Sequence, residues 1–501
     1  MNSTVTVVGG GPAGVMLACE LALAGVPVVV LERKAEPNEF SAGTTLHARS
    51  VELLEQRGLM DRFREDGVLV WPALHFASLW LDLTELIDDE YSLVAYQTRT
   101  EHLLASRAVE LGVEIRRGHE VVSLDQDASG VRLGVRSSAS DYQLECAYVA
   151  GCDGSRSTIR KLSGVTAPAT GIPWYGVLGD LPVYDGHFEV ETYPNGIFAS
   201  VTDGSGGYRL STIEFDVQPP DDGTPVTLDE LGASIERVTG KRRDLAEARY
   251  LARYADVTRH AETYRRGRVF LVGDAAHVYF FPAGHGLNSA LQDAVNLGWK
   301  LAAEINGWAP TGLLDTYHDE RHPAGRRACQ IGMAQLALLY PLERMTPLRE
   351  VLSELLEFDD VNRHLIRAIT DVRYPVKKAR GRRGGTTHAL TGRRVPNAQL
   401  KTATGEISVA STLHTGHGVL LDLSGGTADL STARGWQHRV DTVTAQPSAE
   451  IEAAAALVRP DGHLAWAGDP GADNGMLAAL AEWFGEPDGA SGQHQTGSTV
   501  R

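Results

Sequence analysis

The sequence contains few cysteines, no excess of positive charge and no long uninterrupted apolar run. Its 501 residues include 4 cysteines, and none of them forms a Cys-x-x-Cys pair. This usage is typical of small buried side chains in a reducing compartment, so we expect a cytoplasmic protein without disulfides or metal ligands. The formal net charge of -17 argues against a nucleic-acid partner, because an acidic protein offers no basic surface to phosphates.

Two local stretches could suggest other classes of protein. The basic run at residues 377–383 is interpreted as a solvated linker rather than a binding patch. The apolar N-terminus lacks a basic leader and is interrupted by Gly and Pro, which favours a buried core over a signal peptide or membrane span. We therefore expect no membrane association.

The first thirty residues have the pattern of a dinucleotide-binding βαβ unit. Thr4–Val8 predicts a strand, Gly9–Gly14 a turn, Val15–Ala24 a helix and Val26–Leu31 a second strand. The strand, helix and following acid make this stronger than an isolated glycine motif. The motif by itself does not distinguish NAD from FAD.

Each glycine of the motif has a physical role. Gly9 allows the tight turn, Gly11 lets backbone N–H groups approach a pyrophosphate, and Gly14 lets the helix pack on the strand. The helix N-terminus adds partial positive charge beneath the phosphates. Glu32 ends the second strand about 20 residues on, where a carboxylate can accept hydrogen bonds from a ribose diol.

Two further turns follow apolar strands. Tyr148–Ala150 leads into Gly151-Cys152-Asp153-Gly154, and Arg268–Val272 leads into Gly273-Asp274-Ala275-Ala276-His277. Asp and Gly in such turns permit close approach to a ligand, although ordinary Asx-turns have the same composition. Taken together with the first motif, the three turns favour a ligand site.

Helical spacing appears in three other stretches. Changes in periodicity and composition along the chain predict its domains. Residues 46–65 predict an amphipathic helix or a helix pair, 287–306 a helix with an apolar face, and 313–370 a long helical tract. Residues 376–396 are rich in Gly, Arg and Pro and predict a linker. The predicted units are 1–171, a Rossmann-like α/β domain; 172–267, an inserted, mostly antiparallel sheet; 268–375, the rest of the first domain with long helices; and 390–490, a small α/β domain.

The three turns, with several local motifs, resemble the group A FAD-dependent aromatic monooxygenases over nearly the whole chain. The resemblance is greatest to the aromatic polyketide hydroxylases, which include angucycline-type oxygenases and rifampicin monooxygenase. The matching segments are Leu46-His47-Ala48-Arg49-Ser50, residues 151–157, residues 273–277, residues 291–300 and residues 317–323.

This resemblance implies a fold and a reaction. The fold would be a Rossmann-like FAD-binding domain with an inserted substrate-binding sheet, and the C-terminal domain would be thioredoxin-like. The reaction would use FAD, NADPH or NADH, and O2 to hydroxylate a polycyclic aromatic polyketide through a flavin C4a-hydroperoxide, in secondary-metabolite biosynthesis. Inactivation of an aromatic antibiotic differs from this only in substrate. Both a monomer and a homodimer remain open.

The resemblance also implies roles for individual residues. Asp274 would accept a hydrogen bond from a ribityl hydroxyl, Gln97 would contact the ribityl chain, and Asp153 would lie near the pyrophosphate. A helix beginning near residue 288 would point its N-terminus at the flavin. The cofactor-binding residues would be Gly9, Gly11, Pro12, Ala13, Gly14, Glu32, Arg33, Gln97, Val121, Asp153, Gly154, Asp274, Pro282, Gly286, Leu287 and Asn288, and the catalytic ones Phe281, Pro282 and His285.

The chain departs from the family pattern at two places. Residues 41–45 lack the arginine that family members carry there, and the flavin-facing loop at residues 281–286 has its proline displaced and His285 in place of glutamine. An imidazole there can titrate near neutral pH. Neutral drift explains the change equally well. The alternatives are Baeyer–Villiger oxygen insertion, a rearrangement without net oxidation, or a non-catalytic binding protein that retains FAD.

Two sets of rings have competing interpretations. Tyr279, Phe280 and Phe281 could lie beside the flavin or belong to the core, and the sequence favours neither. His318 and His322 have the four-residue spacing of metal ligands, but no glutamate follows the first histidine and no third ligand is evident. We therefore expect them to be structural.

Overall fold

The fold is described from a computed structural model of the chain. The residues that the structure describes are 4–38, 43, 45–65, 69–71, 73–82, 92–202, 207–217, 224–280, 285–370, 388–469 and 475–488. The expected linker at 376–396 therefore falls outside them as far as residue 387, together with the basic run at 377–383.

A six-stranded sheet forms the centre of the nucleotide-binding region. Its inner strands are buried and apolar because helices cover one face and a second sheet covers the other, as is usual for parallel sheets, whereas the edge strands are partly exposed. All neighbours in it are parallel except β18 and β19. In spatial order the strands are β18 (Arg265–Arg266), β19 (Val269–Leu271), β12 (Tyr148–Gly151), β1 (Val5–Val8), β2 (Val28–Glu32) and β8 (Glu114–Arg117).

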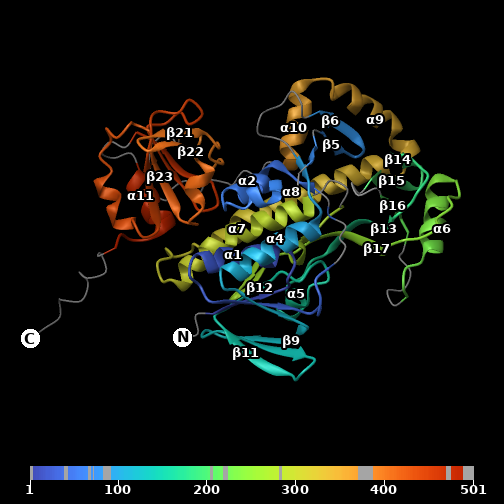
Figure 1. The fold of residues 1–501 in the computed structure, drawn as a ribbon, viewed down its shortest axis with the longest axis horizontal. Helices are drawn as coiled ribbons and strands as arrows, with labels where there is room; N and C mark the ends of the chain where they lie inside the picture. Colours follow the sequence, from blue (N-terminus) through green and yellow to red (C-terminus); the bar gives the residue numbers. More distant parts are fainter. Residues whose placement is uncertain are drawn as a thin grey trace, which may run out of the picture.

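Helices α1 (Pro12–Leu23), α4 (Gln97–Glu110) and α7 (His285–Ile305) cover one face of this sheet. Figure 1 shows the antiparallel strands β9 (His119–Gln126), β10 (Val131–Ser137) and β11 (Tyr142–Cys146) on the opposite side. Helix α1 packs against both α4 and α7, so it is buried along most of its length. This explains why its sequence is apolar nearly all round.

The stretch at 46–65 forms the helix pair, the second of the two expected arrangements. Helix α2 (Ala48–Glu55) and helix α3 (Met60–Glu65) are separated by a turn in which Gly58 has a φ of +64°. Short strands precede and follow them in the chain. These are β3 (Thr45–Leu46), β4 (Leu69–Trp71) and β7 (Ser92–Val94) in one sheet, and the hairpin β5 (Ala73–Phe76) and β6 (Leu79–Asp82).

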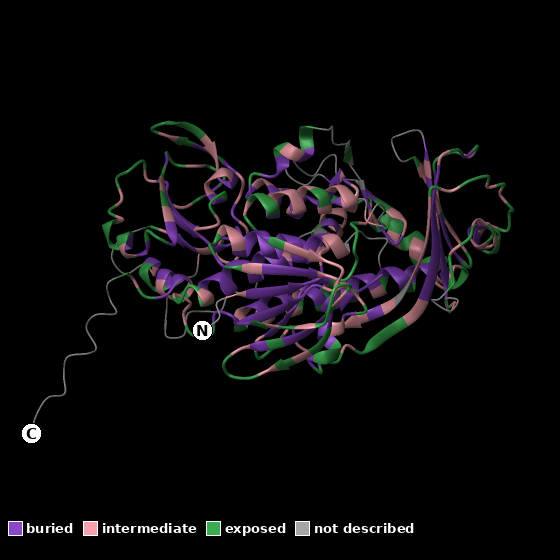
Figure 2. Ribbon diagram, turned by 60° about the horizontal axis from the view of Figure 1, so that its bottom comes forward, coloured by how far each residue is buried: buried purple, intermediate pink, exposed green. Residues whose placement is uncertain are grey.

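The inserted region forms the expected antiparallel sheet. Its spatial order is β14 (Glu189–Tyr193), β15 (Gly196–Thr202), β16 (Tyr208–Phe215), β13 (Ala169–Leu181), β17 (Tyr250–His260) and β20 (His277–Val278). Helix α6 (Leu228–Thr239) packs on this sheet with a core of its own. Strand β20 belongs to the segment of the third turn, so the inserted sheet is anchored beside that turn. Figure 2 shows buried residues running through the central sheet and along this inserted sheet, with exposed loops at the periphery.

The long helical tract consists of α8 (Asp315–Leu339), α9 (Leu342–Leu355) and α10 (Asp359–Thr370). Apolar residues of α8 and α10 share a core with the inserted sheet and the β5–β6 hairpin. No helix of the described ranges combines the length and apolar content needed to cross a bilayer.

The C-terminal region, residues 388–488 here, has its own apolar cores and lies beside one end of α1, α2 and α7 (Figure 1). Its four-stranded sheet has the order β24-β23-β25-β26, in which β23 and β24 are parallel and the other neighbours antiparallel. This arrangement confirms the expected thioredoxin-like α/β fold. The elements are β21 (Gln399–Thr402), β22 (Gly405–Ser408), β23 (Gly418–Asp422), β24 (Val440–Thr444), β25 (Ala455–Val458), β26 (Leu464–Gly468) and α11 (Met476–Phe484).

Candidate functional site

One cavity of about 310 Å³ lies at the carboxyl ends of the parallel strands, where the three turns converge. Strands β2 and β12 lie on opposite sides of β1, so the strand order reverses at the first turn. Such a switch point is where open α/β sheets bind ligands. The described residues that line the cavity all lie between Val8 and Ala290.

The glycines of the first turn divide into structural and open positions. A Cβ on Gly9, whose φ is +111°, would lie 2.3 Å from Cys152 O. A Cβ on Gly14 would lie 2.0 Å from Gly9 O, so this glycine lets α1 pack closely on the turn. A Cβ on Gly11 would meet nothing within 4 Å, and Gly11 lines the cavity. This open backbone at the start of α1 fits a pyrophosphate.

Glu32 holds the first turn from the end of β2. Its Oε2 accepts from Gly10 N at 2.7 Å and its Oε1 accepts from Lys34 N at 2.8 Å. Because each carboxylate oxygen has further lone pairs, Glu32 can still accept from a ribose diol. Glu32 and Arg33 both line the cavity.

Asp153 in the second turn has a clear structural task. Its Oδ2 accepts from Thr158 N and Ile159 N at 2.6 and 3.0 Å, at the start of α5 (Thr158–Leu162). The Asx-turn interpretation therefore applies to this residue, which nevertheless lines the cavity. Beside it, Gly154 has a φ of +79° and open space where a Cβ would be. A ligand can approach the backbone there.

Arg160 joins the second turn to the third. Its Nη2 donates to Ser155 O and its Nη1 donates to Ala275 O, both at 2.8 Å. The side chain is buried, and donation to two carbonyl groups satisfies part of its hydrogen-bonding requirement. The spacing of the two turns is therefore fixed by a buried side chain.

The third turn, the 3-10 helix Gly273–Ala275, is held from beneath by Asp293 of α7. Asp293 Oδ2 accepts from Gly273 N at 3.0 Å and from His277 Nε2 at 2.7 Å, while Oδ1 accepts from Arg321 Nε at 2.6 Å. Burial acts to raise the pKa of Asp293, but Arg321 and His277 outweigh it and hold the pKa below its usual range. This ionised carboxylate fixes the turn that presents Asp274 to the cavity.

Gln97, at the start of α4, also lines the cavity. Its N–H donates to Gly43 O at 2.9 Å, and its Nε2 donates to Glu101 Oε1 at 2.7 Å. A Cβ on Gly43 would lie 2.8 Å from Gln97 Oε1. The close approach of Gln97 therefore favours glycine at position 43, within the stretch that lacks the family arginine.

The structure brings most of the predicted cofactor residues together. Gly14 lies behind the first turn, and Asn288 contacts the β3 region, accepting from His47 N at 2.8 Å and donating to Thr45 O at 3.1 Å. Phe281 and Pro282 fall outside the described residues, as does the side chain of His285 at the start of α7. The predicted residues that line the cavity are Gly9, Gly11, Pro12, Ala13, Glu32, Arg33, Gln97, Val121, Asp153, Gly154, Asp274, Gly286 and Leu287.

Sequence reasoning missed several residues of the site. Arg156 and Thr158 follow the second motif directly, and Lys34 follows the predicted Glu32 and Arg33, so their positions could have been inferred. The others come from α4, β9 and a loop, and carry no motif. The additional lining residues include Lys34, Asn38, Glu101, His119, Glu120, Arg156 and Thr158.

The aromatic residues before α7 have separate environments. Phe280 is fully buried, with its ring centroid 5.8 Å from that of Trp174 and 6.1 Å from that of Phe215. It therefore belongs to the core between the inserted sheet and α8. Tyr279 stacks on His277 with a ring-centroid distance of 5.6 Å.

His318 and His322 make structural contacts. His318 Nδ1 accepts from Tyr264 N at 3.2 Å, His322 Nε2 donates to Ala261 O at 3.1 Å, and the two ring centroids are 4.5 Å apart. The ring of His260 also contacts that of His322, with centroids 4.2 Å apart and the planes tilted by 43°. Within the described ranges, no group of three or more His, Cys, Asp or Glu side chains is arranged to hold a metal ion.

A cavity at the switch point of a parallel sheet, lined by the glycine motif and by two further turns, defines a protein of the dinucleotide-binding class. Comparison with known families makes the class specific. The FAD binding domain family matches residues 2–331, and the family described as the C-terminal domain of aromatic-ring hydroxylases matches residues 388–487. The chain belongs to the FAD-dependent aromatic-ring monooxygenases, which confirms the expected FAD and NAD(P)H chemistry.

Similar proteins cover nearly the full length of the chain. Rifampicin monooxygenase from Streptomyces venezuelae is 42% identical over 96% of this chain and 98% of its own. The solved structure of an anhydrotetracycline hydroxylase from Streptomyces rimosus has a TM-score of 0.89 and 40% identity, covering 97% of this chain and 100% of its own. Dialkyldecalin synthase from Streptomyces rugosporus is 40% identical over 97% of this chain and 99% of its own.

Proposed function

We propose that this monooxygenase is a cytoplasmic enzyme that hydroxylates a polycyclic aromatic polyketide during secondary-metabolite biosynthesis. The observation that carries the proposal is the convergence of three separated turns on one cavity. The substrate class is supported by similarity to enzymes named for rifampicin and anhydrotetracycline. The reducing compartment is supported by the four cysteines, all of which are buried and free.

In this proposal, FAD lies along the cavity with its pyrophosphate at the N-terminus of α1. Gly11 and Gly154 leave room for the phosphates, and Glu32 would accept from the ribose of the adenosine. Asp274 and Gln97, which both line the cavity, would contact the ribityl chain. Gly286 and Leu287, in the first turn of α7, direct the partial positive charge of that helix toward the flavin ring.

Bound FAD supplies the electron transfer from NAD(P)H and the activation of O2 that hydroxylation requires. The protein supplies binding, orientation and exclusion of water. The aromatic substrate would lie between the cavity and the inserted sheet. Phe281, Pro282 and His285 remain the candidate residues at the reacting edge, because they directly precede and begin α7.

The experiment that tests this function is a product analysis. The purified holoenzyme is incubated with NADPH, air and a panel of tetracyclic and angular aromatic polyketides, and products are identified by mass. We expect consumption of O2 and a product heavier than its substrate by one oxygen atom. A product of unchanged mass, formed without NADPH, would instead establish a rearrangement, and no turnover across the panel would reject the substrate class.

A further inference from the structure

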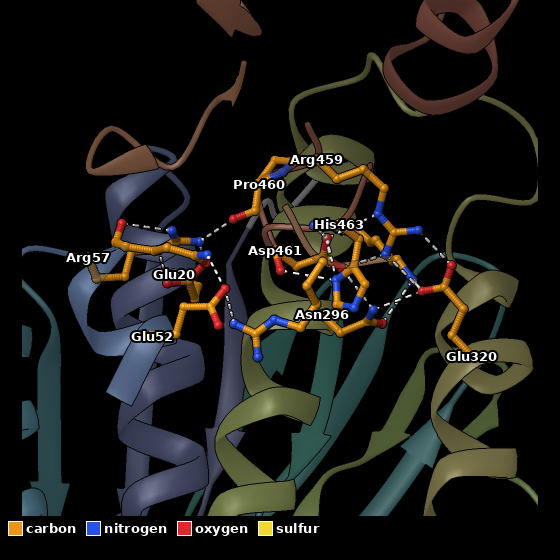
Figure 3. A network of polar contacts seen from close by, with 12 residues as sticks. Glu20, Glu52, Arg57, Asn296, Glu320, Arg459, Pro460, Asp461 and His463 are labelled. Carbon is orange, nitrogen blue, oxygen red and sulfur yellow. Dashed lines mark hydrogen bonds and ion pairs between the residues drawn. The ribbon is translucent and has the colours of Figure 1, made fainter. Parts of the chain in front are cut away.

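The turn Arg459–His463, between β25 and β26, projects from the C-terminal region onto α7 and α8 (Figure 3). Arg459 Nη1 and Nη2 donate to Glu320 Oε1 and Oε2 at 2.7 and 2.9 Å, and Arg459 Nε donates to Asp461 Oδ1 at 3.1 Å. These three side chains are at most 5% exposed. A paired, two-point contact of this kind fixes both the position and the orientation of the turn.

Two side chains of α7 complete the buried cluster. Asn296 Nδ2 donates to Glu320 Oε2 at 2.8 Å and to Asp461 Oδ2 at 3.0 Å. Lys300 Nζ donates to Asn296 Oδ1 at 2.8 Å and to Glu320 Oε2 at 2.6 Å. The formal charges balance, because Lys300 and Arg459 face Glu320 and Asp461. The C-terminal region contributes one charge of each sign.

A second contact fixes the same turn from the side of α1 and α2. Arg57 donates to both oxygens of Glu20 at 2.6 and 2.8 Å, and also to Leu413 O at 3.1 Å and Pro460 O at 2.8 Å. Figure 3 shows Pro460 beside Arg57. The backbone at Gly462 has a φ of +76°, and a Cβ there would lie 2.6 Å from Gln56 Nε2. The turn is thus closely fitted to the FAD-binding region.

The same two helices carry the side chains that hold the third turn of the cavity. Asn296 and Lys300 follow Asp293 by three and seven residues, which places them along one face of α7. On α8, Arg321 directly follows Glu320. Asp293 pairs with Arg321 and accepts from the N–H of Gly273. One pair of helices therefore contacts both the C-terminal turn and the cavity turn, through residues that are neighbours on each helix.

We propose that Arg459 and Asp461 are positioning residues for the flavin site. By clamping α7 against α8, they keep Asp293 and Arg321 in register and so hold the Gly273–Asp274 turn in the conformation that receives FAD. The C-terminal region then contributes to cofactor affinity although the described residues that line the cavity all precede residue 291. This inference rests on the proposed placement of FAD beside Asp274.

The test uses the full chain, stripped of FAD and titrated with it. The double variant Arg459→Met/Asp461→Asn removes one cation and one anion, so Lys300 and Glu320 remain balanced. The matched control is Leu421→Ala, which weakens the apolar core of the C-terminal region away from the cluster. Fluorescence titration gives the Kd for FAD, and hydrogen exchange of the apoprotein reports on the amides of residues 273–277.

We expect the double variant to raise the Kd for FAD at least tenfold and to speed exchange at residues 273–277. We expect Leu421→Ala to lower the Tm yet leave both quantities within twofold. An unchanged Kd for FAD in the double variant would overturn the inference. It would also be overturned if Leu421→Ala lost as much Tm as the double variant and its Kd for FAD rose by the same factor. Should the double variant fail to fold, Arg459→Lys keeps the charge but loses the two-point contact, and a Kd within twofold of wild type would overturn the inference.

A third variant separates this inference from the FAD placement itself. If Asp274→Ala binds FAD with wild-type affinity, the placement is wrong. If Asp274→Ala weakens FAD binding and the double variant does not, only the role of the C-terminal turn is wrong.

Discussion

The cavity and the cluster beneath the C-terminal turn are both polar, but they are built in opposite ways. The cavity wall combines glycine turns with polar and charged side chains, and it has open space at Gly11 and Gly154. The cluster consists of charged side chains that neutralise one another and are nearly inaccessible to solvent. The first arrangement leaves room for a ligand, and the second leaves none. A polar site that binds a ligand therefore differs from one that joins two parts of a protein.

We expect the largest effect on stability when one charge is removed from the cluster. Burial lowers the pKa of Lys300 to about 8, although Glu320 acts in the opposite direction. Burial raises the pKa of Glu320, but Arg459 and Lys300 outweigh it and hold the pKa at about 2. Lys300→Met leaves one buried carboxylate without a balancing charge, so we expect the free energy of unfolding to fall by about 3–5 kcal/mol. Urea denaturation measures the change.

A matched double variant sharpens this prediction. Lys300→Met/Glu320→Gln removes both signs of charge and leaves Arg459 paired with Asp461. We expect it to recover much of the stability lost in Lys300→Met, because the penalty comes from the unbalanced charge. A double variant as unstable as the sum of its single variants would contradict a cooperative cluster.

Substitutions of Gly11 and Gly14 in the first turn should have smaller effects, and the two effects should differ in kind. Gly14→Ala places a methyl group 2.0 Å from Gly9 O, so we expect a loss of about 3 kcal/mol in stability. Gly11→Ala places its methyl group in open space, so the apoprotein should keep its Tm while FAD binding weakens. Thermal unfolding with and without FAD distinguishes them. Equal destabilisation of both apoproteins would mean that Gly11 is not an open position.

We expect the smallest effect at His260, which contacts His322 and does not line the cavity. Burial, aided by His322, lowers the pKa of His260 from 6.5 to about 4. The pKa of His260 is lower in the folded protein than in the unfolded chain, so burial of the neutral imidazole contributes to stability. This contribution is fully present above pH 6.5 and is lost as the pH falls toward 4. After allowance for partial exposure, we expect His260 to account for about 1 kcal/mol of the stability lost between pH 7.5 and 5.

His260→Gln provides the control for this pH dependence. Denaturation at the two pH values should show a shallower loss for the variant than for wild type. Equal losses in the two proteins would assign the pH dependence to other groups.

The two polar sites also differ in how far the sequence predicts them. The spacing of Gly9, Gly11 and Gly14 is local, and their flanking strand and helix are short-range patterns, so the cavity could be anticipated. The βαβ unit, the inserted sheet and the small C-terminal α/β fold follow from the same periodicities. The family resemblance supplied what local spacing does not, including the position of Gln97.

The buried cluster could not be predicted in the same way. Arg459 lies 139 residues from Glu320, and the sequence around neither residue predicts their contact. Lys300 and Glu320 lie in the family segments at 291–300 and 317–323, but those segments do not indicate a contact with the C-terminal region. Asp153 shows a further limit, because the same Asp-Gly turn serves both as a helix cap and as a cavity wall.

We expect three separated turns to bind one FAD, and titration of the Asp274→Ala apoprotein with FAD is the decisive experiment. Asp274 belongs to the turn farthest along the chain from the glycine motif, and its side chain lines the same cavity. Because a lost hydrogen bond to a charged group costs about 1.5–3 kcal/mol, we expect a Kd for FAD at least tenfold above wild type. Wild-type affinity in this variant would show that the third turn does not bind the FAD.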